Sequence, residues 1–329
     1  ISMKEVSRLS GVSPMTVSRA MHAPEMVLPE TLARIQAVID AVGYVPNRVA
    51  GNLSSDRTTQ VALIVPSLGN ALYSEMIQGI SSVLQRENYQ LMISDSGYSL
   101  EQEEKLISAY VAQRVCGIIL HNTQHTERAR QVLKNAGVAC VETGNLCGNP
   151  IDMLVSYSNY KAGFAMAEHL LGLGYRRIGF ASLEVRQNDR LRERRKGFLA
   201  GLRKAGVAID RTLILEVETG LASGGRALAR IIDTDPGINA VFFAGDVLAA
   251  GAILECQRRG INVPGDIAIA ASDDNDLMQN IIPSISTVRF PRYQIGVKSA
   301  ELVIARAQGE ATKQARIDMG FEVIRRGST

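Results

Sequence analysis

Hydrophobic and polar positions divide the chain into a short N-terminal part with helical spacing and a long remainder in which strands alternate with helices. Within residues 1–42 the apolar positions predict three short helices. The second helix is expected to begin at Ser13, a typical cap, with Pro14 at the first helical position. The third is expected to open at Pro29 and to end at Gly43.

A polar segment separates these helices from the rest of the chain. Residues 43–60 are rich in glycine, serine and threonine, which is typical of a linker, and one short helix is predicted within it at residues 47–53. The pattern therefore predicts a head (residues 1–45), a hinge and linker (46–60) and a core (61–329).

The core has the pattern of an α/β protein. Short apolar runs predict strands at residues 61–65, 90–94, 117–120, 138–141, 177–181, 240–243 and 267–271. Amphipathic runs predict helices at residues 73–87, 101–114, 126–136, 161–173, 193–205, 223–232 and 246–259. Continuous apolar strands between such helices are typical of parallel sheets covered on both faces. Two such series predict two doubly wound lobes, with a ligand cleft at the carboxyl ends of their strands.

Composition narrows the functional class only a little. Of 329 residues, 46% are hydrophobic and 21% are charged, which argues against disorder, and the apolar runs are too short for a membrane-spanning helix. The 36 basic and 33 acidic residues nearly balance, so charge alone does not indicate a nucleic-acid-binding protein. Four scattered cysteines without metal spacing, and no visible signal peptide, lead us to expect a cytoplasmic protein.

The run MKEVSRLSGVSPMTVSRAM (residues 3–21) carries the strongest functional signal. A helix, a glycine turn and a second capped helix predict a helix-turn-helix, whose second helix can enter the major groove of DNA. The alternative is an ordinary small helical bundle, because helix pairs with a glycine turn are common. Residues 1–52 contain five basic and four acidic residues, so their charge does not decide between the two.

Sequence motifs in this part of the chain favour the DNA-binding interpretation. V-S-R-L-S-G-V-S-x-x-T-V-S-R (residues 6–19), G-Y-V-P-N-R-V-A (43–50) and Leu53 closely resemble the LacI/GalR family of bacterial transcription regulators. Further matching segments lie at residues 137–141, 173–180 and 263–268. The resemblance therefore extends over essentially the whole chain.

This resemblance implies an all-α helix-turn-helix head and an α/β core that is similar to periplasmic binding proteins. It also implies a homodimeric repressor that binds a pseudo-palindromic double-stranded operator and is controlled by a small effector between the lobes. Lobe 1 is then expected at about 61–157 and 291–318, and lobe 2 at about 158–290 and 319–329. Residues 66–70 and 254–258 resemble the gluconate and 2-ketogluconate branch, so a sugar acid that releases the repressor is expected.

The family motif assigns DNA-binding roles to individual positions. The implied set is Ser13, Pro14, Met15, Thr16 and Arg19 in the head, and Asn47, Arg48, Ala50 and Leu53 in the hinge. In this set Leu53 is the wedge between central base pairs, whereas without the motif a buried linker residue would be the better interpretation. Gly51 weakens an isolated hinge helix by roughly 1 kcal/mol relative to alanine, so the hinge is expected to be helical only on DNA.

Polar residues at the ends of strands form the predicted effector site. They are Ser67, Asn70, Tyr73, His121, Asn122, Glu142, Arg194, Asp246 and Asp273. Arg194 stands three residues before Gly197, as the ligand-clamping arginine of the family does, and a guanidinium suits a carboxylate. Gly245 and Ser272 depart from the residues usual in the family, so the ligand is expected to differ from lactose- or purine-type effectors.

Three other interpretations were weighed. No nucleophile–base set and no phosphate loop are present, so we expect neither an enzyme nor a cofactor. His121 and His125 lack a matching carboxylate or cysteine, so we expect no metal site. A periplasmic sugar-binding protein would share the core but not residues 1–53, and a family member that responds to a neutral sugar remains the other alternative.

Overall fold

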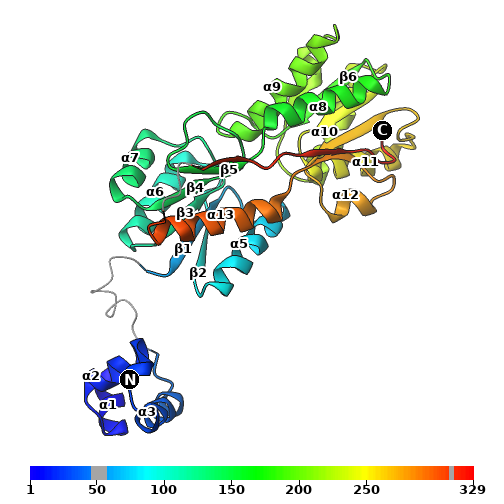
Figure 1. The fold of residues 1–329 in the computed structure, drawn as a ribbon. Coiled ribbons are helices and arrows are strands. Elements are labelled where there is room, and N and C mark those ends of the chain that lie inside the picture. Colours follow the sequence, from blue (N-terminus) through cyan, green and yellow to red (C-terminus); the bar gives the residue numbers. More distant parts are fainter. Residues whose placement is uncertain (46–57, 311–314) are drawn as a thin grey trace. The chain divides into compact units, whose positions relative to one another are not determined.

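The computed structural model describes residues 1–45, 58–310 and 315–329. The chain forms two compact units, Ile1–Thr58 and Thr59–Thr329, which are described here one at a time (Figure 1). Within the described residues, no helix combines the length and the apolar character needed to cross a membrane.

The described residues of the first unit form a bundle of three α-helices. Gly11 lies in the left-handed region with φ 66° and forms the turn between the first two helices. The Ser13 hydroxyl accepts a hydrogen bond from the Thr16 amide at 3.1 Å, so the predicted cap is confirmed. A small core of Val6, Val17, Ala20, Ile35 and Tyr44 holds the bundle together. The helices are α1 (Met3–Ser10), α2 (Pro14–His22) and α3 (Pro29–Val42), with the short 3-10 turn η1 (Pro24–Met26) after α2.

The second unit contains two six-stranded sheets. The first sheet, in lobe 1, is parallel throughout and has the order β11 (Arg316–Asp318), β5 (Met153–Ser156), β4 (Ala139–Glu142), β3 (Gly117–Leu120), β1 (Gln60–Val65) and β2 (Gln90–Asp95). The second sheet, in lobe 2, has the order β12 (Glu322–Ile324), β10 (Ser286–Arg289), β9 (Ala268–Ser272), β8 (Ala240–Phe243), β6 (Ile178–Ser182) and β7 (Ile214–Glu216). Only β12 runs antiparallel to its neighbour among these pairs.

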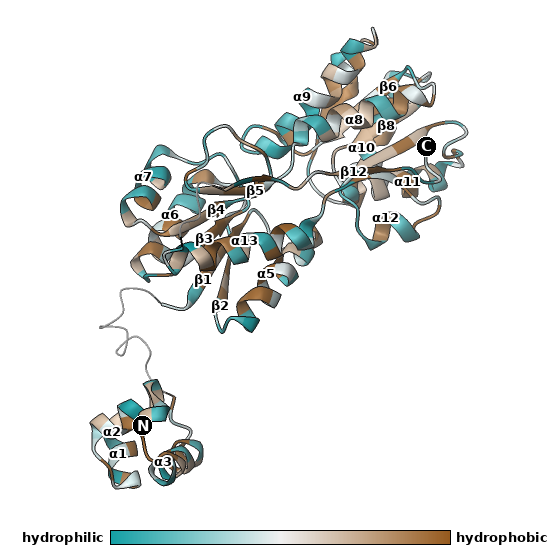
Figure 2. Ribbon diagram, viewed as in Figure 1, coloured by the Kyte–Doolittle hydropathy of each residue, from teal (hydrophilic) through white to brown (hydrophobic). Residues whose placement is uncertain are grey.

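Helices cover both faces of each sheet. In lobe 1 they are α5 (Ser74–Arg86), α6 (Leu100–Ala112), α7 (Glu127–Ala136) and α13 (Arg292–Ala307), together with η2 (Ala71–Tyr73). In lobe 2 they are α8 (Asn159–Gly172), α9 (Asp189–Lys204), α10 (Leu221–Thr234), α11 (Asp246–Arg259) and α12 (Asp276–Asn280), together with η3 (Arg211–Leu213). Strands such as β3 are brown and the outer turns of helices are teal in Figure 2, the distribution expected of buried parallel sheets.

The predicted alternation of strands and helices is confirmed, but the helices α12 and α13 and five short strands were missed. The edge and crossing strands β5, β7, β10, β11 and β12 contain only three or four residues each, too few for a clear periodicity. The sequence also did not reveal that α9 begins at Asp189, four residues before its predicted start. This early start matters because it brings two further arginines, Arg190 and Arg192, to the boundary between the lobes.

Close packing of α9 against α8 positions that boundary. A Cβ atom on Gly197 would lie only 1.9 Å from the backbone oxygen of Tyr160, so any side chain here would force the two helices apart. A Cβ atom on Gly163 of α8 would meet the backbone oxygen of Arg194 in the same way. The two glycines let the helix backbones touch, and the N-terminal turns of α9 are thereby held at the junction of the lobes.

Candidate functional site

Two adjoining cavities lie between the lobes at the carboxyl ends of the strands. The inner cavity has a volume of about 60 Å³ and the outer one about 1420 Å³. Both are lined by Asn70 and Tyr98 from lobe 1 and by Asn188, Thr219 and Asp246 from lobe 2. The inner space is large enough for a few water molecules, and it adjoins the larger outer space, with which it shares lining residues. Together they form the cleft expected for two doubly wound sheets.

Most of the predicted effector residues come together in this cleft. Of the nine, seven line one or both cavities: Ser67, Asn70, Tyr73, His121, Arg194, Asp246 and Asp273. They come from the segments that follow β1, β3, β8 and β9, which include η2 and the first residue of α11, and from the helix α9. Strand ends that are far apart in sequence therefore converge, as the pattern of parallel strands led us to expect.

Glu142 and Asn122 line neither cavity. Glu142 is turned away from the cleft, whereas Asn122 Oδ1 lies 3.5 Å from Nη1 of the cleft residue Arg190, so its effector role stays a prediction. Side chains alternate along a strand, and Glu142 lies on the same face of β4 as Cys140, which packs between α6 and α7. Its carboxylate accepts hydrogen bonds from the Ile151 amide and interacts with His125 Nε2 at 3.2 Å. Asn122 donates from Nδ2 to the Gln124 carbonyl at 2.7 Å within its own loop.

Arg194 is buried in the inner cleft but is already heavily engaged. Its Nη1 donates to Asp273 Oδ2 at 3.2 Å and to the Ala244 carbonyl at 3.3 Å, and its Nη2 donates to Asn159 Oδ1 at 2.8 Å. Arg292 pairs with the other oxygen of Asp273, so one carboxylate is shared between two guanidinium groups. Within the described part of the chain, the buried Nε of Arg194 has no hydrogen-bond partner.

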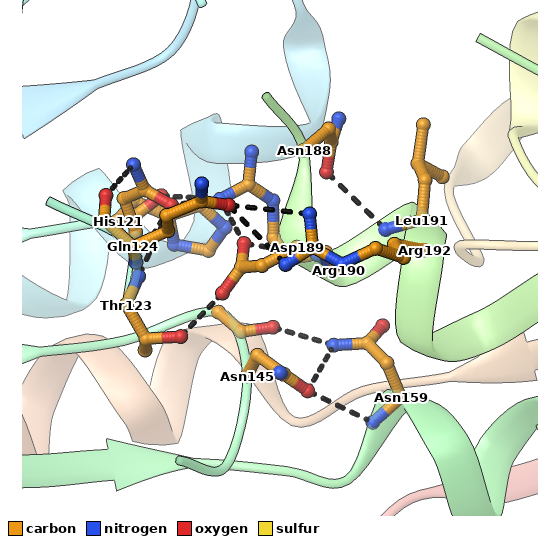
Figure 3. A network of polar contacts seen from close by, with 12 residues as sticks. His121, Thr123, Gln124, Asn145, Asn159, Asn188, Asp189, Arg190, Leu191 and Arg192 are labelled. Atoms are coloured by element: carbon orange, nitrogen blue, oxygen red, sulfur yellow. Dashed lines mark hydrogen bonds and ion pairs between the residues drawn. The ribbon is translucent and has the colours of Figure 1, made fainter. Parts of the chain in front are cut away.

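Arg190 is a cleft residue that the sequence analysis did not select. Its Nη1 donates to the His121 carbonyl of lobe 1 at 2.8 Å and lies 3.4 Å from Asp189 Oδ1 (Figure 3). Among the residues that the structure describes, its Nε and Nη2 make no hydrogen bond, although the side chain lines the inner cavity and is 7% exposed. Arg190 could have been found from its four-residue spacing to Arg194, because that spacing places both side chains on one face of α9.

Two titratable groups of the cleft, Asp246 and His121, are shifted toward their neutral forms. Burial and the negative charge of Asp273 raise the pKa of Asp246 to about 6. Burial and the positive charges of Arg190 and Arg292 hold the pKa of His121 well below its usual value. His121 is therefore neutral at pH 7, and its Nδ1 lies 2.9 Å from the Thr143 hydroxyl. The cleft thus offers cationic donors together with neutral and acidic acceptors, which suits a small polar ligand with an anionic group.

The head presents the predicted DNA-reading residues on one side of α2. Val17 and Ala20 face the small core, whereas Met15 is 71% exposed and Pro14 and Arg19 are also exposed. These exposed side chains are not used by the small core of the head, and their DNA-reading roles stay predictions. The hinge positions Asn47, Arg48, Ala50 and Leu53 lie outside the described residues, so their predicted roles stay predictions.

Comparison with known proteins identifies the family. Residues 2–47 match the model of bacterial regulatory proteins of the lacI family, and residues 167–329 match the model of a periplasmic binding protein-like domain. The chain is 35% identical to the HTH-type transcriptional regulator GntR of Pseudomonas aeruginosa over 329 residues, which is 100% of this chain and 95% of that protein.

Solved structures agree with this assignment. A LacI family transcriptional regulator from Silicibacter pomeroyi superposes with a TM-score of 0.94 at 34% identity, covering 100% of this chain and 99% of that one. The transcription regulator GntR from Chromobacterium violaceum superposes with a TM-score of 0.77 at 32% identity, covering 82% of this chain and 98% of that one. The chain belongs to the LacI family of bacterial regulatory proteins, and it is a DNA-binding transcriptional regulator rather than an enzyme.

Proposed function

We propose that this regulator is a homodimeric repressor that leaves its operator when a sugar acid, gluconate or 2-ketogluconate, binds in the cleft. Two identical heads related by a two-fold axis suit a pseudo-palindromic operator, with the exposed face of α2 in the major groove. Ser13, Pro14, Met15, Thr16 and Arg19 form the proposed contact surface of the head. The hinge contacts proposed from the family motif, which include the Leu53 wedge, complete it. Since the operator is bacterial chromosomal DNA, the proposal places the protein in the cytoplasm.

The observation that carries the sugar-acid proposal is the free edge of Arg190. In the described part of the chain its Nε and Nη2 have no partner, and these two donors form the edge that binds a carboxylate through two parallel bonds. The side chain is buried, so a carboxylate there would be shielded from water and strongly bound. Arg194 contributes a second positive charge and one buried, unpartnered Nε donor.

Hydroxyl groups of the ligand would meet the remaining polar groups of the cleft. Asn70 and Ser67 border it from lobe 1, and Asp246 and Asp273 border it from lobe 2. A polyhydroxy chain can donate to the carboxylates and accept from the amides when the lobes close over it. The similarity to GntR regulators in two bacteria supports the gluconate side of the proposal.

A neutral sugar is the second candidate effector, and one observation favours it. Arg194 already pairs with Asp273, and Arg292 balances the second oxygen of the same carboxylate, so this part of the cleft needs no external anion. The periplasmic alternative is not retained, because residues 1–45 fold as the helix-turn-helix head and residues 2–47 match the lacI family.

Calorimetric titration with matched ligands tests the proposal. Gluconate and glucose share the configuration of C2 to C5, but glucose lacks the carboxylate and is mainly a closed ring, so the first should bind and the second should bind far more weakly. The same gluconate should release the protein from operator DNA in a fluorescence-anisotropy titration. Binding of glucose at equal or higher affinity would favour the neutral-sugar candidate instead.

A further inference from the structure

A short segment after β3 bridges the two lobes. Successive residues of lobe 1, from His121 to Gln124, contact the first turn of α9 in lobe 2 (Figure 3). The Thr123 hydroxyl donates to Asp189 Oδ2, and both Nη atoms of Arg192 donate to Gln124 Oε1 at 3.2 Å. The His121 carbonyl accepts from Arg190, as described above. We refer to residues 121–125 as the bridging segment.

The bridging segment is anchored in lobe 1 by a buried group of charges. His125 Nδ1 lies 2.6 Å from Glu103 Oε1 of α6, and His125 Nε2 lies 3.2 Å from Glu142 Oε1 of β4. All three side chains are at most 3% exposed. Burial lowers the pKa of His125, but the hydrogen bonds and charges of the two carboxylates raise it more, to about 9. A doubly protonated imidazolium therefore donates to both carboxylates at neutral pH and fixes the end of the segment.

One residue, Arg190, belongs both to the contact between the lobes and to the lining of the cleft. Arg190 holds the bridging segment through Nη1, and its side chain also lines the inner cavity. A group bound on the free edge of Arg190 would orient the same guanidinium that holds the His121 carbonyl. The segment is thus placed where occupancy of the cleft and the contact between the lobes affect each other.

We propose that the bridging segment is an inter-lobe latch whose bonds to the first turn of α9 stabilise the closed arrangement of the core, and that His125 is the positioning residue that presents it. The latch deepens the proposed function, since it couples the effector site to lobe movement. Its main test needs no effector and therefore separates the two proposals.

The first experiment measures the distance between the lobes in the full-length protein. Spin labels at exposed Gln85 of α5 and Arg203 of α9, in a Cys147→Ser background, report that distance by pulsed electron resonance. Thr123→Val removes the latch hydroxyl at nearly constant volume. We expect the ratio of open to closed molecules to rise about tenfold, the effect of losing one hydrogen bond to a charged group.

Thr126→Val is the matched control. Its hydroxyl also bonds a carboxylate, that of Glu104, but this contact stays inside lobe 1. The control should lower thermal stability slightly, because Thr126 caps α7, and should leave the distance distribution unchanged. Unchanged distances in Thr123→Val, or an equal change in the control, would overturn the latch.

A double-variant cycle tests whether the contact is the cause. If Thr123 acts through Asp189, then Asp189→Asn combined with Thr123→Val should open the core no more than the larger single change does. Independent, additive effects would mean that the two residues act separately and would also overturn the proposal.

His125→Gln tests the positioning role. Glutamine is neutral and carries both donor hydrogens on one nitrogen, so it cannot span the two carboxylates as the imidazolium does. Hydrogen exchange in the backbone of residues 121–125 should therefore accelerate, and the inter-lobe distances should lengthen as in Thr123→Val. Faster exchange without longer distances would make His125 a purely structural residue. Gluconate titration is a separate experiment. If the wild-type protein does not bind gluconate but the inter-lobe distances change in Thr123→Val and His125→Gln, the effector proposal fails and the latch proposal stands.

Discussion

The free edge of Arg190 makes the sharpest prediction about the effector. Arg190→Met removes the guanidinium but keeps an unbranched chain of similar length in the cleft. Removing one partner of a buried, hydrogen-bonded ion pair costs about 3–5 kcal/mol, so the Kd for gluconate should rise by roughly 150- to 5,000-fold. Glucose has no carboxylate, so the variant should change its affinity far less.

The rise in Kd that comes from losing the carboxylate contact must be distinguished from any rise caused by weakening the contact between the lobes. Arg190→Met also removes the bond to the His121 carbonyl and leaves Asp189 without its cation. Thr123→Val disturbs the same lobe contact but leaves the free edge of Arg190 in place, so it serves as the control. Its effect on gluconate affinity should be about tenfold at most.

Isothermal titration calorimetry at pH 7 gives the comparison directly, with Arg194→Met as the parallel variant. If Arg190→Met binds gluconate within about threefold of wild type while Arg194→Met loses it, the carboxylate sits at the buried Nε of Arg194, as the family motif suggested. If neither variant changes gluconate affinity, the ligand is not recognised through a carboxylate in this cleft.

Three further predictions concern stability and DNA. His125 has its pKa raised from 6.5 to about 9, so about 3 kcal/mol of stability is present below pH 6.5 and is lost as the pH rises through 9. Thermal melts from pH 6 to 10 should show that loss in wild type and a flat profile in His125→Gln. Asp246 has its pKa raised from 3.8 to about 6, so about 3 kcal/mol present below pH 3.8 is lost as the pH rises through 6. Asp246→Asn should therefore reduce the decline in chemical-denaturation stability between pH 4 and 7, and an unaltered decline would contradict the assignment. Met15→Ala should narrow the difference in affinity between operator and random duplex without weakening random binding, whereas Arg19→Ala should cost about 1–3 kcal/mol on the operator if it reads a guanine. Equal losses on both duplexes in anisotropy titrations would show that α2 does not read bases.

Local sequence patterns predicted much of the fold. The cap at Ser13, the proline at the start of α2 and the glycine after α3 are short-range signals, and α2 begins and α3 ends where those signals predict. The apolar runs of β1, β3 and β8 are continuous because both faces of these strands are buried, so the strands and the parallel class of the sheets were readable in advance. The convergence of strand ends on a cleft followed from that class alone.

Tertiary structure decided which side chains reach the cleft. Glu142 ends a strand as His121 nearly does, but the alternation of β4 turns it toward α6 and α7, where it binds His125. Arg190 and Arg194 stand in a run of six basic residues, and only the start of α9 and its close contact with α8 through Gly197 bury these two. Spacing along the chain determines which residues share a helix face. The neighbours that satisfy or leave free a charged group come from distant segments, and only the packed structure brings them together.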